Sequence, residues 1–96
     1  MITANEAMKI AITVNEMKMN RAKLIAQETM PIVEAIIKCD AGEGKCESKF
    51  NLYAYHNFNS KTERTAYRDT ITEILKTNGY IVKYNTIDDY LSIRFF

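Results

Sequence analysis

The fold is decided by the stretch Ser60–Phe96, which reads SKTERTAYRDTITEILKTNGYIVKYNTIDDYLSIRFF. Ser60 and Glu63 form the S-x-x-E pattern of a capping box, in which the two residues satisfy each other's backbone amides at a helix start. Gly79 suits the left-handed position that follows a helix end. These signals predict a helix over 61–78, and its apolar stripe falls at Tyr67, Ile71, Ile74 and Leu75.

After Gly79 the apolar period falls to two residues, as is typical of strands. Side chains alternate through Tyr80–Asn85 and again through Tyr90–Phe95. The polar segment Asn85–Asp89 between them is rich in turn-forming residues. This pattern predicts a β-hairpin at the end of the chain.

The N-terminal third predicts one long helix over Ala4–Lys38. Thr3 and Glu6 form a second capping box, and apolar residues recur at spacings of three and four with Arg21 intruding: Ile10, Val14, Met17 and Leu24. Pro31 lacks the amide donor of an interior helical residue, so it predicts either a kink or the start of a second helix. The kinked continuation is favoured because it keeps the period of Ile25, Thr29, Ile32 and Ile36.

This helix is too long for its own domain. At 1.5 Å per residue it would span about 50 Å, whereas a chain of this size has an expected radius of gyration of about 13 Å. Part of the helix must therefore kink back, project, or pack on a second subunit. Its apolar side chains would otherwise form a patch that soluble monomers seldom expose, so we expect a homo-oligomer, most simply a dimer. Methionines, which adapt to partner surfaces, occur at Met8, Met17, Met19 and Met30.

The middle of the chain predicts a loop over Cys39–Cys46, with glycines as breakers, and then a strand over Ser48–Asn59. The resulting order is helix, strand, helix, strand, strand. With a three-stranded antiparallel sheet and the helices on one face, this is an α+β fold in a single domain over 1–96.

The two faces of the predicted sheet differ in character. The expected core face holds Phe50, Leu52, Ala54, Val82, Leu91, Ile93 and Phe95. The opposite face, with Ile81 and Ser92, carries the candidate binding residues Tyr53, Tyr55, Lys83, Tyr90 and Arg94. Tyrosines beside cations can stack on single-stranded nucleic acid, but they are also favoured at protein interfaces, and the long helix or a partner subunit could simply cover this face. The net charge of +1 favours a protein interface, because phosphate binding depends on a surplus of cations.

Catalytic and metal-binding patterns are weak. His56 is the only histidine, and the sequence marks no nucleophile or carboxylate beside it. Cys39 and Cys46 are further apart than the usual ligands of structural zinc; we expect reduced thiols, with a regulatory disulfide as the alternative. The segment Gly42–Lys45 is not a phosphate loop, because Cys46 stands where Ser or Thr is required. We expect no enzymatic activity, no cofactor and no metal.

The chain has no run of about 18 apolar residues and no basic-then-apolar leader, so we expect a cytoplasmic protein without membrane contact.

Three segments resemble small accessory proteins encoded by tailed phages: Thr3-Ala4-Asn5-Glu6-Ala7, Leu75-x-x-x-Gly79-Tyr80-x-Val82 and Leu91-x-Ile93-x-Phe95. The resemblance implies no shared activity, but such proteins are typically accessory factors that bind host or phage proteins. The overlong apolar helix, the lack of a catalytic pattern and the tyrosine-bearing sheet face lead us to expect a small non-enzymatic accessory or inhibitor protein that binds another protein. Nucleic-acid binding through the tyrosine-bearing sheet face is the alternative.

Overall fold

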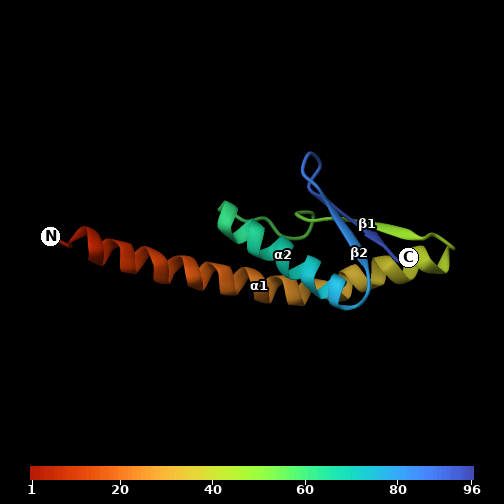
Figure 1. Cartoon of the computed structure of the whole chain (residues 1–96), viewed down its shortest axis with the longest axis horizontal. Coiled ribbons are helices and arrows are strands. Elements are labelled where there is room, and N and C mark those ends of the chain that lie inside the picture. The colour runs from red at the N-terminus through yellow and green to blue at the C-terminus, as the bar shows by residue number, and fades with distance from the viewer.

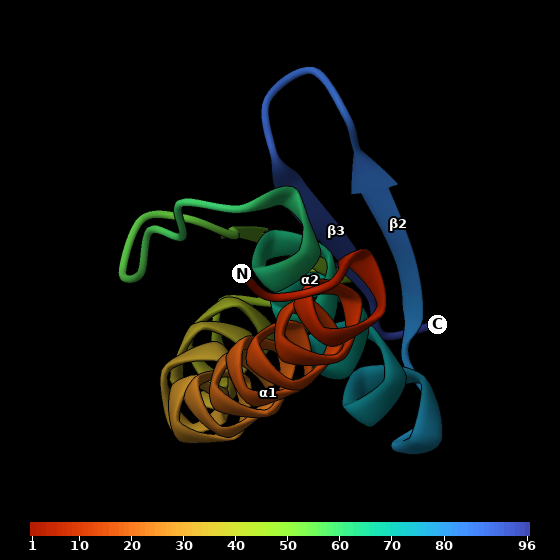
Figure 2. The ribbon, with the colours of Figure 1, turned by 90° about the vertical axis from the view of Figure 1, so that its left-hand side faces the viewer.

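The computed structural model describes all 96 residues. It contains two helices and three strands, in the order α1 (Ala4–Gly42), β1 (Glu47–Asn51), α2 (Lys61–Thr77), β2 (Ile81–Asn85) and β3 (Tyr90–Arg94). The strands form one antiparallel sheet in the order β1-β3-β2. Figures 1 and 2 show both helices on the same side of this sheet. The predicted α+β fold is therefore confirmed.

Helix α1 is continuous through Pro31, and Figure 1 shows its axis bending in that region. The kinked continuation is thus the correct alternative, since Pro31 offers no amide to the carbonyl four residues earlier. The predicted end at Lys38 is wrong, because α1 runs on to Gly42. The last turn is stabilised by amides beyond it, where Glu43 N, Gly44 N and Lys45 N donate to carbonyls of Cys39, Asp40 and Ala41.

Only the C-terminal part of α1 packs on the rest of the chain. Its buried residues form the stripe Ala22, Ala26, Thr29, Val33 and Ile37. The predicted stripe was wrong in part: Ile25 and Ile36 lie on its flank and are only partly buried. The small side chains of Ala22 and Ala26 let α2 approach closely, which Ile25 would not.

The N-terminal part of α1 projects from the body as a single helix (Figure 1). Every residue before Met19 is exposed. The chain measures 63 × 24 × 20 Å, with a radius of gyration of 16.4 Å, above the value of about 13 Å expected for a compact chain of this length. Of the possibilities left open by the sequence, the structure shows projection.

Helix α2 matches its predicted bounds to within one residue. Ser60 Oγ accepts from Glu63 N at 3.2 Å, which confirms the predicted N-cap. The Glu63 carboxylate returns to the Ser60 hydroxyl, which donates to Glu63 Oε1 at 3.0 Å, and not to the Ser60 amide as the capping box predicts. At the other end Gly79 has φ +91°, the left-handed conformation that the sequence predicted. The buried side of α2 consists of Ala66, Tyr67, Ile71 and Leu75.

The hairpin is also confirmed. Strands β2 and β3 pair from Ile81 with Arg94 to Asn85 with Tyr90. At the turn, Asn85 Oδ1 accepts from Ile87 N and Asp88 N at 3.0 Å, and Asp89 adopts a positive φ of 49°. These local bonds fix the register of the hairpin.

The predicted strand over Ser48–Asn59 is too long, because β1 ends at Asn51. Its neighbour is β3, which begins at Tyr90 opposite Asn51. After one more bond, from Leu52 N to Asp89 O, no strand remains for the chain to pair with. The chain then turns, and Phe58 packs against Tyr67 with their ring centroids 5.0 Å apart.

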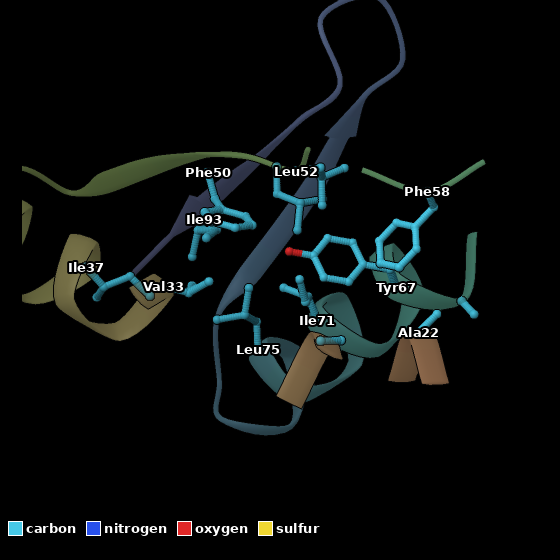
Figure 3. Packing of buried hydrophobic residues seen from close by; sticks show 13 residues of the cluster. Ala22, Val33, Ile37, Phe50, Leu52, Phe58, Tyr67, Ile71, Leu75 and Ile93 are labelled. Atoms are coloured by element: carbon cyan, nitrogen blue, oxygen red, sulfur yellow. The ribbon is translucent and has the colours of Figure 1, made fainter. Parts of the chain in front are cut away.

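The core lies between the sheet and the two helices. Figure 3 shows Tyr67 of α2 pointing into it among side chains from the sheet, the segment after β1 and α1. The cluster includes Phe50, Leu52, Leu91 and Ile93 from the predicted core face, all fully buried. Val82 and Phe95 pack against it and are partly buried, but Ala54 is exposed because β1 ends before it.

Candidate functional site

One face of the sheet is free of helices (Figure 2). Alternation places Lys83 of β2 and both Tyr90 and Arg94 of β3 on this open face. Ser92 pairs with Lys49 on one side and Lys83 on the other, so two lysines flank the central strand. The structure therefore brings together three of the five candidate binding residues.

The other two candidates lie elsewhere. Tyr53 follows the end of β1, and its ring lies 6.2 Å from that of Tyr67. Its hydroxyl donates to Arg64 O at 3.5 Å, and burial raises the pKa of Tyr53. The placement of Tyr53 on the open face was wrong, because the chain has already turned toward α2.

Tyr55 is exposed, but it too is outside the sheet. Its ring stacks against Phe50 with a centroid separation of 6.0 Å and an interplanar angle of 6°. Phe50 belongs to the core side of the sheet. The open face consequently carries one tyrosine, Tyr90, instead of the three expected from the sequence.

Lys49 is a surface residue that the sequence interpretation missed. Its ammonium lies 5.2 Å from the centre of the Tyr90 ring, which places a cation over an aromatic face. Strand alternation could have identified Lys49, since it neighbours the core residue Phe50 and must therefore lie on the opposite face. We call Lys49, Lys83, Tyr90 and Arg94 the open-face cluster; Glu47, which pairs with Arg94, adds the only acidic side chain on this face.

The projecting part of α1 is the second candidate surface. Large apolar side chains are exposed all along it: Met8, Ile10, Ile12, Val14 and Met17. Nothing in the chain covers them, so this segment is an apolar helix surface free to contact another molecule.

Tyr84 shows how the core side of the hairpin is tied to α2. Its hydroxyl donates to Asp89 Oδ1 at 2.6 Å, and the Arg68 guanidinium lies 4.5 Å from the ring centre. The hydrogen bond to the Asp89 carboxylate raises the pKa of Tyr84. This arrangement orients the hairpin and leaves its open face unobstructed.

His56 lies in the segment between β1 and α2, not in a strand as expected. It is partly buried, and its ring meets Tyr67 edge-on at 6.2 Å. Cys39 and Cys46 are exposed and unpaired. The structure gathers no group of three or more His, Cys, Asp and Glu side chains that could hold a metal ion.

Comparison with known proteins gave no relatives: no protein-family model, curated protein or solved structure matches this chain. Neither helix has a segment apolar and long enough to span a membrane.

Proposed function

We propose that this chain is a small non-enzymatic accessory or inhibitor protein, of the kind that tailed phages encode, which binds another protein in the cytoplasm and acts as a homodimer. The observation that supports this proposal is the projecting part of α1. A helix of this length without tertiary contacts is marginal in water, and its exposed isoleucines, valine and methionines are residues that proteins normally bury. A partner surface would stabilise the projecting helix and bury its apolar side chains.

The surface for the target is the strip formed by Met8 and Ile12. These residues continue, at helical spacing, the line of Met19, Ala22 and Ala26 that packs on the body. A target that covers this strip would extend the existing apolar core along α1. Met8 is 54% exposed and Ile12 is 49% exposed, so both side chains offer area for burial.

The test is capture of the tagged chain from a nuclease-treated lysate of the cell in which it is made. The variant Met8→Glu with Ile12→Glu is compared with Lys9→Glu, which makes the same change in net charge on the polar side of the same helix. A stoichiometric protein that is retained by wild type and by Lys9→Glu, but lost from the double variant, supports the proposal. A protein retained equally by all three overturns the role of this strip.

A second function, nucleic-acid binding, is favoured by the open-face cluster. Lys49, Lys83 and Arg94 lie on an uncovered sheet face around the partly buried ring of Tyr90 on the central strand. Cations around an aromatic ring are the composition of a surface that stacks bases and neutralises phosphates. Fluorescence anisotropy with a labelled single strand, measured at several salt concentrations, tests this function. Binding should weaken with salt and disappear in Lys83→Ala with Arg94→Ala, whereas Lys9→Ala with Lys23→Ala, away from this face, should bind as wild type does. Absent or salt-insensitive binding would exclude it.

A further inference from the structure

The projecting helix carries a second apolar line, distinct from the strip of Met8 and Ile12. Its members alternate at spacings of three and four residues: Ala7, Ile10, Val14, Met17, Arg21 and Leu24. We call this line the seam. A spacing of this kind is the a/d pattern by which two helices pack side by side. From Ala7 to Leu24 it covers about 26 Å of helix at 1.5 Å per residue.

The seam faces away from the body of the protein. Leu24 is 59% exposed, although Ala22, two residues earlier, is fully buried against the body. Two residues on a helix are separated by about 200° of rotation, so Leu24, the seam residue beside the body, lies on the far side of α1 from the buried Ala22. Along the projecting part, Ile10 and Met17 are 57% and 67% exposed. No element of the chain itself can therefore cover the seam.

Arg21 indicates which molecule covers the seam. It interrupts an otherwise apolar seam, and it forms no ion pair within the chain. A parallel pair of helices would place Arg21 against Arg21 and the small Ala7 against Ala7, which combines like-charge repulsion with a packing defect. An arbitrary apolar groove would leave the guanidinium without an anion.

An antiparallel second copy satisfies every seam position. In that alignment the facing pairs are Ala7 with Leu24, Val14 with Met17, and Ile10 with Arg21. Small side chains then meet larger ones, as close packing requires. The apolar stem of Arg21 lies on Ile10 of the other copy, which is how long cationic side chains cover apolar surface.

Glu6 supplies the missing anion. It lies one helical turn before Ile10, so the guanidinium of the facing Arg21 reaches it along the helix surface. The Glu6 carboxylate, like Arg21, has no ion-pair partner within the chain. Because the arrangement is two-fold symmetric, the pair occurs twice and the assembly closes at two subunits.

From these observations we propose that the seam pairs with a second copy of this chain in an antiparallel helix dimer, held in register by Arg21 of each copy on Glu6 of the other. The inference rests on the dimer of the proposed function and names its surface and direction. It leaves the strip of Met8 and Ile12 and the open-face cluster uncovered. Since the N-terminal part of α1 extends away from the body (Figure 1), antiparallel pairing places the two bodies at opposite ends of the paired helices.

Disulfide trapping tests the direction. In a background in which Cys39 and Cys46 are changed to Ser, one tagged chain carries Ala7→Cys and an untagged chain carries Leu24→Cys. Oxidation of the mixture should give mainly the mixed disulfide, seen on non-reducing gels and by mass spectrometry. Prevalent Ala7→Cys homodisulfides would show a parallel pair, and an uncross-linked mixture that sediments as a monomer would show no pair; either result overturns the proposal.

Charge reversal tests the register. Glu6→Arg or Arg21→Glu alone should weaken the dimer about tenfold or more, since each creates two like-charge contacts, and the double variant should recover most of the loss. Glu16→Arg, off the seam, is the control and should dimerise as wild type does. Analytical ultracentrifugation over a range of concentrations gives the dissociation constants, and a double variant that remains as weak as the single ones overturns the Arg21–Glu6 pairing.

The experiments distinguish failure of the antiparallel dimer from failure of target binding. A seam variant that becomes monomeric yet still captures the target through Met8 and Ile12 leaves protein binding independent of the dimer. A chain that forms the mixed disulfide but retains no target through that strip keeps the antiparallel dimer and overturns the target-binding function alone.

Discussion

Tyr67 of α2 and Thr29 of α1 are joined across the core by a hydrogen bond in which the Tyr67 hydroxyl donates to Thr29 Oγ1 at 3.4 Å. Both side chains are fully buried. Thr29 in turn donates to the Ile25 carbonyl at 2.7 Å. The buried hydroxyls are therefore satisfied in series, and no buried side-chain nitrogen or oxygen lacks a partner.

Removing the acceptor of this bond should destabilise the protein more than removing its donor. Thr29→Val leaves the Tyr67 hydroxyl buried without an acceptor, which should cost about 1–3 kcal/mol. Tyr67→Phe removes the donor, while Thr29 keeps its bond to Ile25, so the loss should be smaller, about 1 kcal/mol or less. Urea unfolding followed by circular dichroism measures both free energies, and equal losses would show that the bond does not contribute as the geometry indicates.

Stability should also decrease at alkaline pH. Burial, the larger influence, raises the pKa of Tyr67 above its ordinary value of 10.0. The folded state then binds a proton that the unfolded chain releases, so the contribution of Tyr67 to stability is constant below about pH 10 and falls as the pH rises beyond it. Tyr67→Phe should show a shallower fall than wild type, whereas Tyr55→Phe, which changes an exposed ring, should follow the wild-type curve. Identical curves for all three proteins would contradict the assignment.

The elements that the sequence predicted well are those whose signals are local. Ser60 with Glu63 caps α2, and Gly79 ends it, through bonds between residues a few positions apart. The end of β1 was missed because it depends on where β3 begins, at Tyr90. The sequence near Asn51 does not indicate where the partner strand β3 begins.

The candidate site residues that were predicted well are likewise those whose position depends on local signals. Lys83, Tyr90 and Arg94 were placed correctly because hairpin alternation fixes their face. Tyr53 and Tyr55 were misplaced because the alternation of β1 was extended beyond its last paired residue. The projection of α1 was one of several outcomes that the helix length allowed, and choosing among them required knowing how few residues α2 could cover.

Two isoleucines distinguish the core from the surface. Ile71 is fully buried, whereas Ile87 at the hairpin turn is 88% exposed. Ile71→Ala should cost about 2–5 kcal/mol, because it removes buried methyl groups and leaves a cavity. Ile87→Ala should change stability by about 0.5 kcal/mol or less. Urea midpoints of the two variants measure the contrast, and comparable losses would mean that Ile71 does not pack as described.

The two helix caps should contribute unequally. Ser60→Ala removes the oxygen that accepts from Glu63 N, and should cost the body about 1 kcal/mol. Thr3→Ala removes an equivalent acceptor for Glu6 N, but that cap belongs to the projecting end of α1. Near-ultraviolet circular dichroism, which reports on the packed tyrosines, should therefore show a lower urea midpoint for Ser60→Ala alone. A matching shift in Thr3→Ala would indicate that the projection is coupled to the body.

The junction of α1 and β1 should lose stability in acid. Asp40 Oδ2 accepts from the Ser48 hydroxyl at 2.6 Å, and this bond, more than the nearby Lys45, lowers the pKa of Asp40 below its ordinary value of 3.8. A lowered pKa in the folded state adds stability that is present above the ordinary pKa and lost as the pH falls through the lowered one.

Asp40→Asn should therefore be less stable than wild type at neutral pH, and the difference should shrink as the pH falls below about 4. Asp88→Asn, at an exposed turn, is the matched control and should stay parallel to wild type throughout. Urea unfolding at a series of pH values provides the comparison. A difference between Asp40→Asn and wild type that stays constant into acid would show that the Asp40–Ser48 bond does not depend on the charge of the carboxylate.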